Sequence, residues 1–141
     1  MNAPDFLDTN ILIYAYDPLD PRKQGIARDL IKRGAMGDLV ISTQVLSEFA
    51  ATLLHKMRPK ARAEDIAAVL NILHPLRVVA PDGEIVRRAV EAHAEYGVHF
   101  YDGMIVAAAE RGGCRRIWSE DLKAGQKYFG ITIENPFAIV A

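Results

Sequence analysis

Four acidic residues lie near the ends of expected helices and strands, where carboxylates from distant parts of a chain can meet. They are Asp8, Glu48, Asp102 and Asp121. Several carboxylates in one cleft repel one another, and their charged forms are costly unless a cation compensates. An oxygen-rich acidic cluster without histidine or cysteine suits Mg²⁺ or Mn²⁺ rather than zinc. A divalent cation held there can bind a phosphate oxygen and generate hydroxide from water, so these residue types indicate metal-assisted hydrolysis of phosphodiester bonds.

Two polar residues accompany the acids. Asn10 follows Asp8 by two positions, and Ser119 precedes Asp121 by two positions. Either side chain could hydrogen-bond the carboxylates or water molecules bound to the metal, which would fix the ligands in place.

Each acid taken alone also has an ordinary structural explanation. Aspartate is a favoured helix cap, so Asp8 and Asp102 could cap the helices that follow them. Glu48 fits a solvated helix face, since glutamate is mostly exposed, and Asp121 fits a loop. Only the joint placement of the four acids at element ends favours a functional role.

Short apolar strands and amphipathic helices alternate along the chain and would have to position these acids. Strands are expected at residues 6–8, 38–42, 78–79, 117–118 and 131–133. Helices are expected at residues 10–16, 22–33, 45–57, 63–73, 82–97 and 102–111. The run Met104–Ala109 is apolar on every side, which predicts a helix buried within the fold.

This alternation is typical of a parallel sheet with crossover helices. The predicted fold is α/β: one three-layer domain over residues 1–141, with a central, mainly parallel β-sheet flanked by helices. Ligands of such sheets bind beyond the carboxyl ends of the strands. The acids that follow strands are therefore expected at one edge of the sheet.

The composition limits the possible functions. The chain has 141 residues, half of them apolar, with 17 Lys+Arg against 18 Asp+Glu and a net charge of -1. A balanced charge argues against polybasic binding, so nucleic acid would have to contact local basic patches. Cys114 is the only cysteine, which excludes an internal disulfide and a cysteine-rich zinc site. The sequence has no signal peptide and no apolar stretch of membrane-spanning length, so we expect a cytoplasmic protein without membrane contact.

Four segments together resemble the PIN-domain family, and most of all its VapC-type toxin ribonucleases from bacterial toxin–antitoxin pairs. In chain order these segments are FLDTNIL at 6–12, SEF at 47–49, YDGMIVAA at 101–108 and WSEDL at 118–122. The resemblance implies a PIN fold, endoribonuclease activity with Mg²⁺ or Mn²⁺, and RNA as the substrate. It also implies a cognate antitoxin as a partner and a homodimer.

The resemblance also assigns roles to particular residues. The acidic positions of the family, which are both catalytic and metal-binding, fall on Asp8, Glu48, Asp102 and Asp121. Its polar supporting positions fall on Asn10 and Ser119. Glu120 adjoins Asp121, so either could point into the site, and the family pattern favours Asp121.

The leading hypothesis is a metal-dependent endoribonuclease that acts as the toxin of a toxin–antitoxin pair. The alternative is a catalytically silent α/β module whose acidic cleft binds a basic protein segment. A phosphoryl-transfer enzyme with Asp8 as its nucleophile fits less well, because the second aspartate of that pattern would stand where Asn10 does. Tyr101 could stack on a nucleic-acid base, although packing is the expectation for this ring, and for His93 as well.

Overall fold

A six-stranded sheet organises the structure, a computed structural model that describes residues 3–34 and 38–138. Its strands run in the spatial order β3-β2-β1-β4-β6-β5. All neighbours pair in parallel except β5 and β6, which pair antiparallel. The bounds are β1 Asp5–Leu7, β2 Leu39–Ser42, β3 Arg77–Val79, β4 Arg116–Trp118, β5 Lys127–Tyr128 and β6 Ile131–Glu134. The predicted α/β fold with a central, mainly parallel sheet is therefore confirmed.

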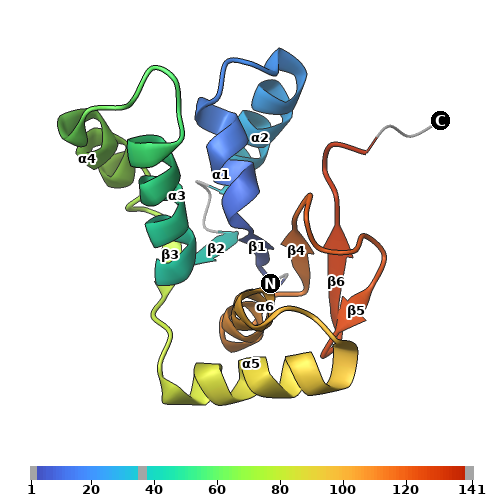
Figure 1. Ribbon diagram of the computed structural model, residues 1–141. Helices are drawn as coiled ribbons and strands as arrows, with labels where there is room; N and C mark the ends of the chain where they lie inside the picture. The colour runs from blue at the N-terminus through green and yellow to red at the C-terminus, as the bar shows by residue number, and fades with distance from the viewer. Residues whose placement is uncertain (1–2, 35–37, 139–141) are drawn as a thin grey trace.

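Helices connect the parallel strands and cover the sheet. Their bounds are α1 Thr9–Tyr16, α2 Pro21–Gly34, α3 Thr43–His55, α4 Ala63–Ile72, α5 Gly83–Tyr96 and α6 Phe100–Arg111. In Figure 1 the strands separate α1 to α4, in the upper part of the view, from α5 and α6 in the lower part. Among the helices of the described ranges, none is long and apolar enough to cross a membrane.

The core lies between the sheet and its helices, and the apolar run in α6 forms part of it. Ile105, Val106 and the three alanines that follow are buried, as the sequence predicts. Small residues let α6 approach α5 closely: a Cβ atom on Gly103 would lie 2.7 Å from the carbonyl oxygen of Ala89. A real Cβ does not come this near to a backbone oxygen, so the packing of α6 on α5 requires glycine at position 103.

Two local features differ from the sequence expectation. The helix that carries Asp102 begins two residues earlier, at Phe100, and its N-cap is His99, whose side chain accepts a hydrogen bond from the N–H of Tyr101. Asp102 therefore lies in the first turn, and its interpretation as the cap is wrong. The short strand β5 was not expected, because two residues carry no periodicity; it is positioned by pairing with β6.

Candidate active site

The candidate site lies where the strand order reverses. β1 lies between β2 and β4, with Leu7 paired to Trp118, so the residues that follow these two strands are neighbours. Within the sheet, β2 and β3 lie on one side of β1, whereas β4 and β6 lie on its other side. Ligands of open α/β sheets bind at such a switch point, beyond the carboxyl ends of the strands. Asp8 directly follows β1, and Ser119 directly follows β4.

Asp8 is the most buried of the four acids, with only 6% of its surface exposed. Its Oδ1 accepts a hydrogen bond from the N–H of Thr9 at 2.8 Å, which caps α1. Its Oδ2 accepts one from the Ser119 hydroxyl at 2.7 Å. Burial raises the pKa of Asp8 from 3.8 to about 6, although both hydrogen bonds lower it, and nearby Asp121 and Asp102 raise it further. Asp8 therefore caps α1 and is also a carboxylate whose charged form is destabilised by burial. A role as helix cap and a role in a functional site do not exclude each other.

Asn10 joins two acids from opposite ends of the chain. Its amide nitrogen lies 3.1 Å from Oδ2 of Asp121 and 3.5 Å from Oδ2 of Asp8. Its amide oxygen accepts the N–H of Glu120 at 3.2 Å. The Ser119 hydroxyl oxygen accepts the N–H groups of Asp121 and of the residue after it, each at 3.1 Å. Hydrogen bonds of Asn10 and Ser119 therefore connect Asp8 with the segment that carries Asp121.

Glu120 points away from the site. Its carboxylate forms an ion pair with Lys23 and accepts the hydroxyl of Tyr14 at 2.7 Å. Asp121, by contrast, is held by Asn10 on the same side as Asp8. Of these two neighbouring acids, Asp121 is therefore the one that shares a hydrogen-bond donor with Asp8.

Glu48 reaches the site from α3 and is held by two residues that the sequence analysis missed. The hydroxyl of Thr9 donates to its Oε2 at 2.9 Å, and the amide of Gln44 donates to its Oε1 at 2.8 Å. Gln44 stands four residues before Glu48 on the same helix face, which is a signal that the sequence contains. The contact of Thr9 with Glu48 joins α1 to α3, and only the fold creates it.

Asp102 completes the acidic group from the first turn of α6. Burial raises the pKa of Asp102; His99 lowers it, whereas Asp121 and Glu48 raise it. An acid in the first turn also gains from the helix dipole. These mutual effects on pKa place the acids within electrostatic reach of one another, although they come from four separate segments.

The donor set fits a hard divalent cation. None of the ion pairs between described residues involves Asp8, Glu48, Asp102 or Asp121. Within residues 3–34 and 38–138, no three His, Cys, Asp or Glu side chains lie close enough to hold an ion by themselves. Mg²⁺ usually keeps several waters and takes only one or two carboxylates from the protein. A site at which no three acidic side chains lie close together therefore still suits this ion. The oxygen Oε1 of Gln44 is buried beside the acids without a hydrogen-bond donor in the described part of the chain, as expected where water or a ligand belongs.

A cleft of about 440 Å³ lies between α1 and α3, beside two of these acids. Glu48 and Asp121 line it together with Asn10, and His55 and Lys56 at the end of α3 line it as well. The cleft therefore combines carboxylates with cationic or neutral polar groups, an arrangement that suits a substrate with a phosphate backbone.

The fold and the site define a class: an α/β protein with carboxylates at the switch point of a mainly parallel sheet. The sequence profile described as "PIN domain" matches residues 6–129, and the chain belongs to the PIN-domain family. No curated protein matches the chain by sequence.

Solved structures with a similar fold come from toxin–antitoxin proteins. One is a toxin–antitoxin complex from Klebsiella pneumoniae, with a TM-score of 0.71, 18% identity and coverage of 98% of this chain and 100% of that one. Another is DNA-bound VapBC from Salmonella typhimurium, with a TM-score of 0.69, 21% identity and coverage of 96% and 99%. A third is VapC20 of Mycobacterium tuberculosis, a toxin that cleaves the sarcin-ricin loop, with a TM-score of 0.62, 22% identity and coverage of 83% and 91%. At these identities the likeness concerns the fold, and it agrees with the VapC resemblance of the sequence.

Proposed function

We propose that this PIN-domain protein is a metal-dependent endoribonuclease and the toxin of a toxin–antitoxin pair. The observation that carries the proposal is the convergence of Asp8, Glu48, Asp102 and Asp121 at one edge of the sheet, with no cationic side chain paired to them among the described residues. Structures of similar fold include a toxin that cleaves the sarcin-ricin loop, which supports RNA as the substrate.

Asp8 and Asp102 would be the principal ligands of Mg²⁺ or Mn²⁺, with Glu48 and Asp121 completing the acidic site. Such an ion supplies Lewis-acid polarisation of the phosphate and a more acidic water when it is bound. Ser119 and Asn10 keep Asp8 and Asp121 in fixed rotamers, and Thr9 with Gln44 does the same for Glu48. Fixed carboxylates avoid reorganisation during the reaction, and that preorganisation is a large part of electrostatic catalysis.

The proposal is tested by incubating the purified protein with a mixed-sequence RNA and Mg²⁺. The parent should cleave the RNA, EDTA should stop cleavage, and Asp8→Asn and Asp102→Asn should each reduce the rate by at least about a hundredfold. If both variants cleave as fast as the parent, these acids do not form the active site. If the parent itself leaves RNA intact at saturating Mg²⁺, the silent module that binds a basic protein segment becomes the better account.

An antitoxin is the proposed protein partner. Support comes from the similar structures, several of which are complexes of toxin with antitoxin. We expect the antitoxin to lay a basic or apolar peptide near the acidic cleft, and basic side chains of that peptide would pair with the carboxylates. Co-expression with the product of the neighbouring reading frame should yield a stable complex with suppressed RNA cleavage, whereas separate elution with full activity would refute the partner. The homodimer stays a prediction, which light scattering of the purified chain tests.

A further inference from the structure

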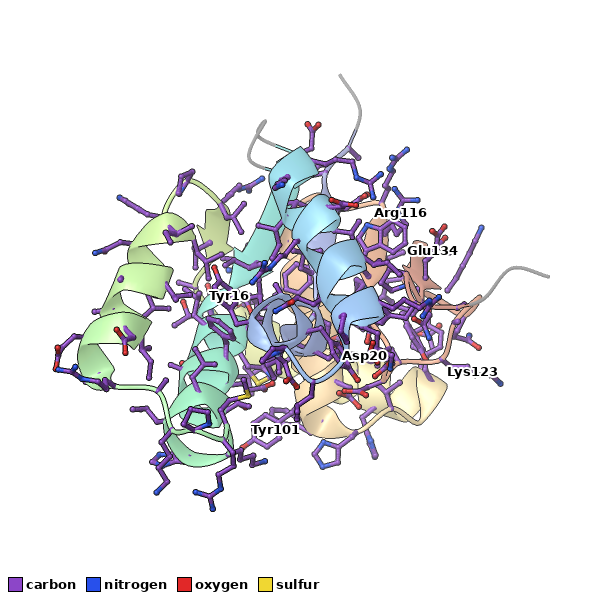
Figure 2. The ribbon with its side chains drawn as sticks, turned by 90° about the horizontal axis from the view of Figure 1, so that it is seen from above. Tyr16, Asp20, Tyr101, Arg116, Lys123 and Glu134 are labelled. Atoms are coloured by element: carbon purple, nitrogen blue, oxygen red, sulfur yellow. The ribbon has the colours of Figure 1, made fainter. Side chains whose placement is uncertain are left out.

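Tyr101 is an aromatic ring on the surface beside the acidic site. Its exposed fraction is 58%, and among the described Phe, Tyr and Trp residues it is the only one whose side chain is exposed. The sequence expectation that this ring packs in the interior is therefore wrong. Figure 2 shows Tyr101 at the periphery of the molecule, on the side away from Arg116 and Glu134. The ring of Tyr101 is therefore accessible to a ligand in solution.

The ring is held in a defined position. Tyr101 lies in the first turn of α6, and its N–H donates to Nδ1 of His99. The His99 ring stacks on it with centroids 5.8 Å apart and an interplanar angle of 27°, and the Phe100 ring meets its edge at 5.2 Å. Neighbouring rings and a helical backbone limit the rotamers of Tyr101, so little entropy remains to be lost when something stacks on it.

Tyr101 is also tied to the acids themselves. Its carbonyl oxygen accepts a hydrogen bond at 3.1 Å from the amide of Gln44, and the same amide donates to Glu48. The next residue in the chain is Asp102, a proposed metal ligand. The amide of Gln44 therefore links the backbone of the first turn of α6, which carries Tyr101, to the carboxylate of Glu48.

We propose that Tyr101 is a stacking platform for one unpaired base of the RNA, next to the phosphate that enters the acidic site. Every base offers a flat π face, so an exposed ring can hold a strand without reading its sequence. A base within a duplex is already stacked and paired, whereas bases of loops and single strands can be splayed onto a protein ring. Tyr101 would therefore favour an unpaired base over a paired one. This inference rests on the proposed nuclease function and adds a specificity determinant to it.

Equilibrium binding separates this inference from the nuclease proposal. The probe is a fluorescein-labelled, mixed-sequence 12-nucleotide RNA, measured by anisotropy on an Asp8→Asn background that does not cut it. A second sample contains the same strands annealed with their complements. Tyr101→Leu removes the ring while keeping a good helix former, and Tyr101→Phe keeps the ring. Ile72→Ala, which trims a side chain that is 65% exposed on α4, is the matched surface control.

Loss of one base–ring contact should weaken binding of the single strand by at least about fivefold in Tyr101→Leu. Tyr101→Phe and Ile72→Ala should bind like their background, and the duplex should bind more weakly than the single strand and be indifferent to Tyr101. The inference is overturned if Tyr101→Leu binds the single strand as tightly as its background, if the duplex binds equally well, or if no RNA binds. Loss of antitoxin copurification with unchanged RNA binding would assign the ring to a protein contact instead.

Failure of the nuclease proposal has a different signature. The parent, with Asp8 intact, would then bind single-stranded RNA through Tyr101 but leave it uncut at saturating Mg²⁺.

A cleavage assay tests the stacking role in a second way. Tyr101→Leu should raise KM by the same factor by which it weakens binding of the single strand, and Tyr101→Phe should restore the KM of the parent. Thermal unfolding of both variants checks that the helix is intact.

Discussion

Replacement of Asp8 by asparagine should change how the stability of the protein depends on pH. In the folded chain the pKa of Asp8 is raised from 3.8 to about 6, chiefly by burial. A carboxyl group with a raised folded-state pKa binds its proton more tightly when folded. The stability that it contributes is therefore full below pH 3.8 and is lost as the pH rises through about 6. The two pKa values give a loss of about 1.4 kcal/mol between pH 5 and pH 8.

Asparagine cannot titrate, so this loss should be absent from Asp8→Asn. Its amide oxygen can still accept the N–H of Thr9, which preserves the cap of α1. Any hydrogen bond lost to Ser119 shifts the stability by the same amount at both pH values and cancels in the comparison. In urea unfolding with EDTA present, the free energy of unfolding of the parent should fall by about 1.4 kcal/mol more than that of Asp8→Asn between pH 5 and pH 8.

Asp82→Asn is a suitable control. Hydrogen bonds from Arg111 lower the pKa of Asp82 to about 2, which lies outside the range of the experiment. Its stability profile should therefore run parallel to that of the parent between pH 5 and pH 8. Parallel profiles for the parent and Asp8→Asn would refute the assignment of Asp8 as a buried, destabilised carboxylate.

Four further substitutions test particular contacts. Ser119→Ala removes the acceptor of two backbone N–H groups and the 2.7 Å donor to Oδ2 of Asp8, so we expect a loss of about 1–3 kcal/mol of stability and a cleavage rate lower by about ten- to a hundredfold. Ser47→Ala, at an exposed position, should change neither. Gly103→Ala forces a Cβ against the backbone of Ala89 and should destabilise by about 1–3 kcal/mol in chemical unfolding, whereas Gly25→Ala, with open space on α2, should stabilise by about 0.5–1 kcal/mol. Glu120→Gln should retain cleavage activity because this acid is paired with Lys23, and equal losses in Glu120→Gln and Asp121→Asn would contradict the orientation of the two acids. Lys56 lines the cleft, so Lys56→Gln should reduce the slope of log affinity for single-stranded RNA against log salt concentration by about 0.7. If Lys32→Gln on α2 changes this slope by the same amount, the RNA does not bind specifically along the cleft.

The parts of the site that the sequence predicts are those governed by local patterns. Asp8 follows a short apolar strand and Asp121 follows another, so the rule for parallel sheets brings them to one edge without knowledge of the fold. The apolar run from Met104 to Ala109 likewise predicts a buried helix. Glu48 is a candidate from its place in a predicted helix, where it also fits a solvated glutamate, and the motif resemblance strengthens the functional interpretation.

The remaining contacts depend on tertiary structure. His99 rather than Asp102 caps α6, and a residue's cap preference alone does not determine where a helix begins. His93 was expected to pack, but it is exposed, since the buried face of α5 is formed by Ile85, Ala89 and Ala92. Burial of an aromatic ring depends on the neighbours that the fold supplies, so the exposure of Tyr101 could not be read from the sequence.

Calorimetric titration of the purified protein with Mn²⁺ tests most directly whether the four acids form one cation site. If the acids hold one cation, Mn²⁺ should bind the parent saturably, with proton release that grows below pH 6 because Asp8 must lose its proton. Binding should weaken by at least about tenfold in Asp8→Asn and in Asp102→Asn, and should be unchanged in Glu120→Gln. Mn²⁺ binding that is absent from the parent, or equally tight in Asp8→Asn and Asp102→Asn, would show that these acids do not form a cation site.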